Sequence, residues 1–221
     1  MSKQVALKWL WFGAGFVSVA ALVRWQLARL FTEKPNYELE RRSGDVEIRG
    51  YAAGWVAETT VDEARWDVAL NEGFRRLAGH IFGDNRPSPF QPDRLGRLGA
   101  RGSADTTETL AMTVPVNVTP ASRSSHIIAL NLPPGRTLAS LPAPNDERVR
   151  LESRPERRVA VLRYRGRHTD NRVAQKFSEL IATLRSAGLQ CRGMPQFAAY
   201  DPPSTLPLFR RNEVWVELAP A

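Results

Sequence analysis

The chain has 221 residues, of which 43% are apolar, enough to bury one well-formed core. Its 31 Lys and Arg residues outnumber its 23 Asp and Glu residues, and the net charge of +8 suits anionic partners such as phosphates, lipid headgroups or carboxylates. The arginines are dispersed and no recognition motif accompanies them, which argues against nucleic-acid binding. A single cysteine, Cys191, excludes an internal disulfide and a cysteine-rich metal site.

An apolar segment near the amino terminus runs from Trp9 to Val23 without a charged side chain. Because flanking basic side chains can reach the membrane surface, a helix from about Val5 to Phe31 would be long enough to cross a bilayer. Residues 1–33 are therefore predicted to form a single-pass membrane anchor. The alternative is a signal peptide that is cleaved after Ala20 or Ala21.

The remaining residues, 34–221, are predicted to form one soluble domain. Basic residues flank both ends of the apolar segment about equally, so the positive-inside rule does not set its orientation. We expect the domain on the extracytoplasmic, periplasmic side of the membrane. We also expect it to be monomeric.

The domain begins with a pattern of strands followed by a helix. Apolar and charged residues alternate from Tyr37 to Ile48, and Trp55 to Val61 continues as a further strand, which predicts half-buried antiparallel strands. Apolar residues at spacings of three and four then predict an amphipathic helix over Glu63 to Phe82, with Asp62 as its N-cap. Gly83 ends the helix.

A long connection, residues 85–109, follows this helix. It is rich in Gly, Pro, Asp and Ser, so it is either a lid or a disordered loop. Strands are expected again over Leu110 to Val118 and Ser125 to Asn131. The last strand, Glu213 to Leu218, alternates valine and leucine with other residues and should point its apolar side chains one way.

The second half of the domain repeats the first at a shift of about 103 residues. The shift aligns Val46 with Val149 and Leu77 with Leu180. Each predicted strand or helix of the first half is thereby aligned with one of the same kind in the second half. Neither half alone can bury its apolar side, so we expect a pseudo-twofold α+β domain.

Five stretches resemble successive signatures of the SOUL haem-binding protein family, in order and spacing, across residues 37–219. They are VEIRGY (46–51), GFRRLAGHIFGDN (73–85), MTVPV (112–116), AAYDPPSTLP (198–207) and RRNEVW (210–215). The resemblance implies a distorted β-barrel of two antiparallel four-stranded sheets flanked by two long helices. This fold is related to the effector-binding domains of bacterial regulators.

The resemblance also implies a ligand, haem b or another porphyrin, held in an apolar groove between the first helix and a late loop. Carried over residue by residue, the groove residues on the helix and the loop are Asn71, Phe74, Ala78, Gly79, Tyr200, Pro203 and Leu206. Arg75 is placed to meet a propionate. A structural alternative for Phe74 is that it faces the core, as its repeat partner Phe177 would.

The chain departs from the family pattern in ways that bear on iron ligation. Some members have a histidine directly after the IR of the first signature, and here that residue is Gly50. Asn71 stands where the family helix has a basic residue. No metal ligand is therefore predicted: His80 is expected to pack or cap the helix, and His126 and His168 are expected to be exposed.

No catalytic residue is predicted, because the chain has no GxSxG elbow, HExxH helix or CxxC pair. Some hydrolases of the related effector-domain superfamily use a glutamate, so Glu72 is a weak candidate. The sequence thus predicts a membrane-anchored, non-catalytic carrier or buffer of a tetrapyrrole. The runner-up is an effector-type pocket, which includes a hydrolytic version, for an apolar ligand other than porphyrin. A third reading is a protein-interaction module.

Overall fold

The computed structural model describes residues 34–90, 107–202 and 204–220. The predicted membrane anchor, residues 1–33, and most of the predicted loop 85–109 lie outside them. Within the described ranges, no helix is long and apolar enough to cross a membrane. The helices are α2 (Trp66–Ile81), α3 (Asp170–Ser186) and two short 3-10 helices, η3 (Leu138–Ser140) and η4 (Pro207–Phe209).

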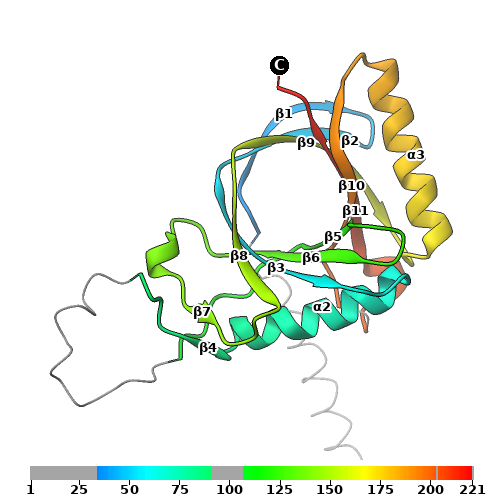
Figure 1. The fold of residues 1–221 in the computed structure, drawn as a ribbon. Helices are drawn as coiled ribbons and strands as arrows, with labels where there is room; N and C mark the ends of the chain where they lie inside the picture. Colours follow the sequence, from blue (N-terminus) through cyan, green and yellow to red (C-terminus); the bar gives the residue numbers. More distant parts are fainter. Residues whose placement is uncertain (1–33, 91–106, 203, 221) are drawn as a thin grey trace, which may run out of the picture. The chain divides into compact units, whose positions relative to one another are not determined.

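Nine strands form one antiparallel sheet in the order β1-β2-β9-β11-β10-β5-β6-β3-β8 (Figure 1). In chain order they are β1 (Tyr37–Ser43), β2 (Val46–Tyr51), β3 (Gly54–Val61), β5 (Val116–Pro120), β6 (His126–Asn131), β8 (Val149–Arg154), β9 (Arg157–Arg165), β10 (Cys191–Ala199) and β11 (Arg211–Leu218). A separate pair joins β4 (Asn85–Arg86) to β7 (Ala143–Pro144).

The strand order confirms the internal repeat. The repeat pairs β2 with β8, β3 with β9, β5 with β10 and β6 with β11. When each strand is replaced by its repeat partner, the order from β2 to β8 becomes the same order read backwards. The spacing agrees as well: Val46 and Val149, the first residues of β2 and β8, lie 103 positions apart, as do Gly54 and Arg157, the first residues of β3 and β9. The domain is therefore α+β and pseudo-twofold, as predicted.

The prediction of two separate four-stranded sheets needs correction. The strands β2-β9-β11-β10 and β5-β6-β3-β8 are the two expected groups, but β5 and β10 also pair with each other. Three residues of β10, from Phe197 to Ala199, face Val118 to Val116 on β5, and this short ladder makes the sheet continuous. Among the described strands the sheet curves strongly without closing, and β1 and β8 are its edges (Figure 1).

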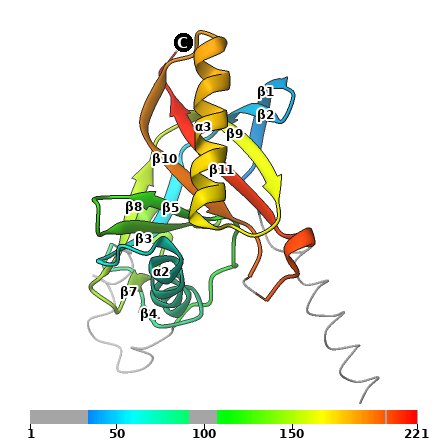
Figure 2. The same ribbon diagram turned by 90° about the vertical axis from the view of Figure 1, so that its right-hand side faces the viewer.

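The apolar core lies between the outer face of the curved sheet and the two helices (Figures 1 and 2). α2 packs on β3 and β6, whereas α3 packs on β9, β10 and β11. Leu77 and Leu180, which the repeat makes equivalent, are both 0% exposed. Val214, Val216 and Leu218 of the last strand all face this core, as predicted. Because side chains alternate along a strand, the intervening residues face the inside of the curve.

A glycine sets how closely α2 approaches the sheet. A Cβ atom at Gly73 would lie 2.3 Å from Ile128 Cγ1 on β6, much closer than carbon atoms pack. Any other residue would push the helix off the strand. The signature residue Gly73 thus has a packing role.

Two predicted boundaries differ from the structure for identifiable reasons. α2 begins at Trp66 rather than Glu63, and its N-cap is Arg65 rather than Asp62. The carbonyl of Glu63 accepts from His126 Nδ1 at 2.9 Å, and the first N–H groups of the helix donate to the carbonyl of Arg65. The strand expected from Leu110 begins only at Val116, since the preceding residue is a proline and has no N–H for a sheet ladder.

The ends of the long connection after α2 are fixed by one side chain. Asn85, which is 2% exposed, donates from Nδ2 to the carbonyls of His80 and Glu108, each at 2.7 Å. Its Oδ1 accepts from the Glu108 N–H at 3.0 Å. The side chain of Asn85 therefore links both ends of this connection to the end of α2.

The buried histidines have different surroundings. His126 was expected to be exposed, but it is 8% exposed because its ring reaches the turn before α2. His80 is 2% exposed, in agreement with its predicted packing role, and neither ring nitrogen has a hydrogen-bond partner among the described residues. Burial lowers the pKa of His80, against a smaller opposing effect of Asp84. The imidazole is therefore neutral in the folded state.

We predict that His80 makes stability depend on pH. As pH falls below about 6.5, the unfolded chain binds a proton at this residue and the folded chain does not, so the free energy of unfolding falls. His80→Leu should remove this contribution and raise the free energy of unfolding at neutral pH by about 1 kcal/mol, because two unpaired nitrogens leave the core. Urea denaturation between about pH 5 and about pH 8 measures both effects. Parallel pH profiles of the two proteins would contradict this prediction.

Candidate functional site

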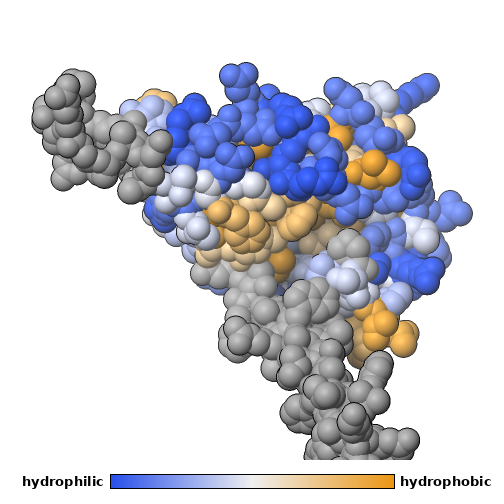
Figure 3. Space-filling view, turned by 90° about the horizontal axis from the view of Figure 1, so that it is seen from below, coloured by the Kyte–Doolittle hydropathy of each residue, from blue (hydrophilic) through white to orange (hydrophobic). Residues whose placement is uncertain are grey.

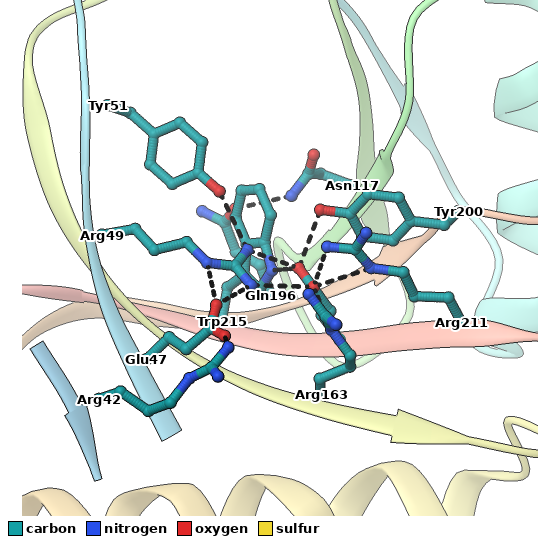
Figure 4. Close-up of polar contacts among 11 residues, drawn as sticks. Arg42, Glu47, Arg49, Tyr51, Asn117, Arg163, Gln196, Tyr200, Arg211 and Trp215 are labelled. Carbon is teal, nitrogen blue, oxygen red and sulfur yellow. Dashed lines mark hydrogen bonds and ion pairs between the residues drawn. The ribbon is translucent and has the colours of Figure 1, made fainter. Parts of the chain in front are cut away.

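A buried cluster of charged and aromatic side chains lies on the inner face of the sheet (Figure 4). Glu213 on β11 is fully buried at its centre. Arg49 on β2, also fully buried, donates from Nη1 to Glu213 Oε2 at 3.0 Å and from Nη2 to Glu213 Oε1 at 3.1 Å. Its Nε donates to Glu47 Oε2 at 2.8 Å. One guanidinium thus links two carboxylates and connects β2 to β11 over the intervening β9.

Further donors surround Glu213. It accepts hydrogen bonds from the Tyr200 hydroxyl at 2.9 Å, Trp215 Nε1 at 2.8 Å and Arg211 Nη2 at 2.6 Å. Burial alone would raise the pKa of Glu213, but the hydrogen bonds and charges of Arg49 and Arg211 outweigh it and lower the pKa to about 2. Burial raises the pKa of Tyr200, so its hydroxyl stays protonated and donates. The carboxylate is saturated with donors, which suits a structural role rather than proton transfer.

This cluster contains one of the residues predicted to line the ligand groove. The ring of Tyr200 lies 4.1 Å from the guanidinium carbon of Arg211, and its hydroxyl is held by Glu213. The sequence prediction placed Tyr200 with an apolar ligand. In the structure its ring packs against the inner face of the sheet.

The predicted groove residues on the first helix lie along much of its length. Phe74 is half-buried and packs against the core, and Arg75 donates to Glu72 Oε2 at 2.6 Å. Asn71 donates to the carbonyl of Asp67 at 2.9 Å, and Gly79 lies about 12 Å further along the helix at 1.5 Å per residue. Ala78 is in the same last turn. The side of the molecule on which α2 lies carries apolar surface bordered by hydrophilic surface (Figure 3).

An open cleft of about 790 Å³ lies where the first turns of α2 and α3 meet the loop after β10. Leu206, another predicted groove residue, lines it, and Pro203 lies outside the described residues. The cleft therefore brings Leu206 together with the start of α2. Its full lining is Arg65, Asp67, Arg167, His168, Thr169, Asp170, Asn171, Ser204, Thr205, Leu206, Pro207 and Arg210.

Three aromatic rings join the elements around this cleft. Trp66, the first residue of α2, has its ring centroid 5.2 Å from that of His168 and 4.9 Å from that of Phe197 on β10. The Trp66 indole also donates to Asp170 at the start of α3. His168 was predicted to be exposed, but these rings leave it half-buried. The three residues fix the two helix starts against the sheet.

The charge of the cleft favours anions. Its arginines, Arg65, Arg167 and Arg210, outnumber its two aspartates. The N-cap residues of both helices make no side-chain cap, but the carboxylate of Asp67 accepts from backbone N–H groups in the first turn of α2. Thr205, which is 1% exposed, has a hydroxyl with no hydrogen-bond partner among the described residues. The cleft thus combines three cations, two carboxylates and apolar loop residues.

Sequence reasoning missed Trp66, His168 and Arg167 as site residues. The internal repeat contained the relevant signal, because a pseudo-twofold axis brings equivalent elements together. The starts of α2 and α3 are such elements, and the Trp66 to Asp170 contact joins them.

The weak catalytic candidate is held in ion pairs. Glu72 accepts from Arg76 Nε at 3.1 Å and from Arg75 Nη1 at 2.6 Å. The hydrogen bond from Arg76 is the main cause that lowers the pKa of Glu72. A carboxylate stabilised in this way is a weaker general base than an unpaired one.

Comparisons with known proteins give a family and a fold. A family model described as SOUL heme-binding protein matches residues 32–217. Heme-binding protein 2 of the mouse, Mus musculus, is 29% identical over 185 residues, which cover 83% of this chain and 82% of the mouse protein. The C-terminal domain of EcmrR has a TM-score of 0.50 and 8% identity, covering 84% of this chain and 99% of that one. A hydrolase from Listeria innocua has a TM-score of 0.52 and 8% identity, covering 81% and 94%. The two structures show the α+β fold alone.

We predict that the inner cluster stabilises the sheet through Arg49. Arg49→Met removes the fully buried cation that links Glu213 to Glu47 and should lower the free energy of unfolding by about 3–5 kcal/mol. Arg42→Met is the matched control, since Arg42 also pairs with Glu47 but its side chain is 60% exposed. The control should cost less than about 1 kcal/mol in urea denaturation. Equal losses in the two variants would contradict the structural role of the cluster.

Proposed function

This chain belongs to the SOUL heme-binding protein family, and we propose that it binds a tetrapyrrole in the cleft between the starts of α2 and α3. The ligand in this proposal is haem b or another porphyrin. The chain acts as a carrier or buffer and catalyses no reaction. One observation carries the proposal: the cleft places Leu206, Pro207 and the ring of His168 beside three arginines.

The residues of the cleft fit the chemistry of a porphyrin, which has a flat apolar body and two carboxylates. Leu206 and Pro207 offer apolar contact, and Leu206 is 63% exposed. Arg167 suits the propionates, together with Arg65, which also pairs with Asp67 at 3.0 Å. The volume of about 790 Å³ falls within the range of about 300–1,000 Å³ of small-molecule sites. Bound haem supplies a redox-active iron, whereas the chain supplies binding and orientation.

The groups outside the cleft support a non-catalytic role. Glu213 is saturated with donors and Glu72 is ion-paired, so neither is a ready proton acceptor. The family membership points in the same direction. The fold is shared with a protein described as a hydrolase, but a likeness of fold carries no activity.

The face of α2 around Phe74 is the second place where a porphyrin can bind, as the family resemblance implies. There the half-buried Phe74 and the exposed Arg75 provide an apolar contact and a cation. We favour the cleft because it is concave and has more cations. Substitutions in the cleft and on the face of α2 distinguish these two candidate sites.

We further propose that residues 1–33 anchor the chain in a membrane, with the domain on the extracytoplasmic side. The support is the uncharged segment from Trp9 to Val23 and its basic flanks. Haem partitions into membranes, so an anchored domain would meet its ligand at the bilayer surface.

Haemin titration of the full chain, followed by the Soret band, tests the proposed site. Leu206→Asp places a carboxylate against the apolar ligand and should weaken binding by about tenfold or more. Leu208→Asp is the matched control, because Leu208 lies on the same loop and is 78% exposed but does not line the cleft. The control should bind haemin like the unaltered chain.

The same titration includes Phe74→Asp and Arg75→Glu. The cleft predicts little change of the dissociation constant in either. A larger loss in these two variants than in Leu206→Asp would move the site to the face of α2. Unsaturable uptake by the unaltered chain would reject tetrapyrrole binding in favour of an apolar ligand of another kind.

Alkaline carbonate extraction of cell membranes tests the anchor. We expect the full chain to remain with the membrane pellet. Val17→Asp combined with Val19→Asp should release it, since a charge at the centre of a membrane helix costs about 2.5–3.5 kcal/mol. Release of the unaltered chain would contradict the anchor but would leave the proposed ligand site unaffected.

A further inference from the structure

His168 occupies a defined position at the cleft. Its ring packs against Trp66 and Phe197, with centroid separations of 5.2 Å and 5.5 Å. The side chain also lines the cleft. The contacts with these two rings, which also contact each other, restrict the rotation of the imidazole at the edge of the cleft.

A neighbouring amide determines which ring nitrogen carries the proton. Asn212, which is 2% exposed, donates from Nδ2 to the carbonyl of Gly166 at 2.9 Å. This bond turns its Oδ1 towards His168 Nδ1, 3.4 Å away. An amide oxygen only accepts, so Nδ1 carries the hydrogen and Nε2 has the lone pair.

Nε2 is the open atom of this ring. It has no hydrogen-bond partner among the described residues. It is also not one of the fully buried side-chain atoms that lack a partner in this part of the chain. Burial, and then the positive charge of Arg210, lower the pKa of His168. The imidazole is therefore neutral at pH 7 and its Nε2 lone pair is available.

We propose that His168 is the axial ligand of the iron when haem is bound in the cleft. This inference rests on the proposed tetrapyrrole site and deepens it. A histidine that ligates a metal through one nitrogen usually donates its other N–H to a fixed acceptor, and Asn212 provides that acceptor. The ligand expected after the IR of the first signature is Gly50 in this chain, so the iron would be approached from a different element.

The other candidate ligands are placed less well. Both ring nitrogens of His80 are buried in the core, and His126 is 8% exposed with Nδ1 engaged by Glu63. Cys191 is at the opposite end of β10 from the cleft, about 26 Å from Ala199 for a strand rising about 3.3 Å per residue. All three histidines of the chain lie within the described residues, and His168 is the one that lines the cleft.

The test compares haemin with metal-free protoporphyrin IX on the full chain. His168→Phe keeps an aromatic ring against Trp66 and Phe197 but has no lone pair. It should weaken haemin binding by about 10–100-fold, as loss of a metal-site interaction does, and change the affinity for metal-free protoporphyrin by no more than about twofold. His126→Gln is the control histidine and should bind both compounds like the unaltered chain.

A spectroscopic measurement distinguishes ligation from packing. The ferrous nitrosyl complex of the unaltered chain should show, in electron paramagnetic resonance, extra splitting from a nitrogen opposite the nitric oxide. His168→Phe should lose this splitting, and added imidazole should restore it in His168→Ala. If the Phe variant does not fold, the imidazole rescue of the Ala variant decides the question by itself.

The outcomes separate this inference from the proposed function. Identical spectra and equal haemin affinities in the unaltered chain and His168→Phe would overturn axial ligation while the tetrapyrrole site stands. Equal losses for haemin and metal-free protoporphyrin would assign His168 to packing and also overturn it. Failure of the unaltered chain to bind either compound would overturn the proposed function and the inference together.

Discussion

Trp66 joins the two halves of the fold at the point where both helices begin. Its ring contacts His168 from the connection before α3 and Phe197 from β10, and its indole N–H donates to Asp170. These contacts hold three segments that are far apart in the sequence. The cleft exists because they meet there, and its arginines, helix starts and apolar loop all depend on that meeting.

The inner cluster around Glu213 stabilises the same region from the other side of the sheet. Arg49 and Glu213 are 164 residues apart in the chain and belong to different halves of the repeat. A buried ion pair gains little over apolar packing, but removing one partner is costly. The cluster also holds Tyr200, which begins the loop that carries Leu206 to the cleft. The buried charges around Glu213 and the charges that line the cleft are thus two separate groups.

Periodicity and spacing made much of the fold predictable. The apolar spacing along the chain was enough to predict the 103-residue repeat, the two helices and the core face of Val214 to Leu218. Boundaries failed where one residue interrupts a pattern, as where Pro115 delays the start of β5 to Val116. The single continuous sheet was not predictable, because it depends on the short ladder between β5 and β10.

The candidate site was less predictable than the fold. Leu206 was found through its signature, but Trp66 and His168 become neighbours only through the pseudo-twofold arrangement of the helices. Arg49 follows an alternating pattern typical of a solvent-facing strand position, yet it is 0% exposed because the sheet curves over it. Polar residues on a strand do not reveal whether the face they share is open or covered.

Nuclear magnetic resonance of the tryptophan indoles tests the location of the ligand most directly. With the indoles labelled with nitrogen-15, metal-free protoporphyrin IX should shift the Trp66 signal through the ring current of the macrocycle. The Trp215 signal, buried beside Glu213, serves as an internal reference and should not move. A saturable shift at Trp66 alone would support the cleft. Saturable binding that leaves Trp66 unchanged would contradict it.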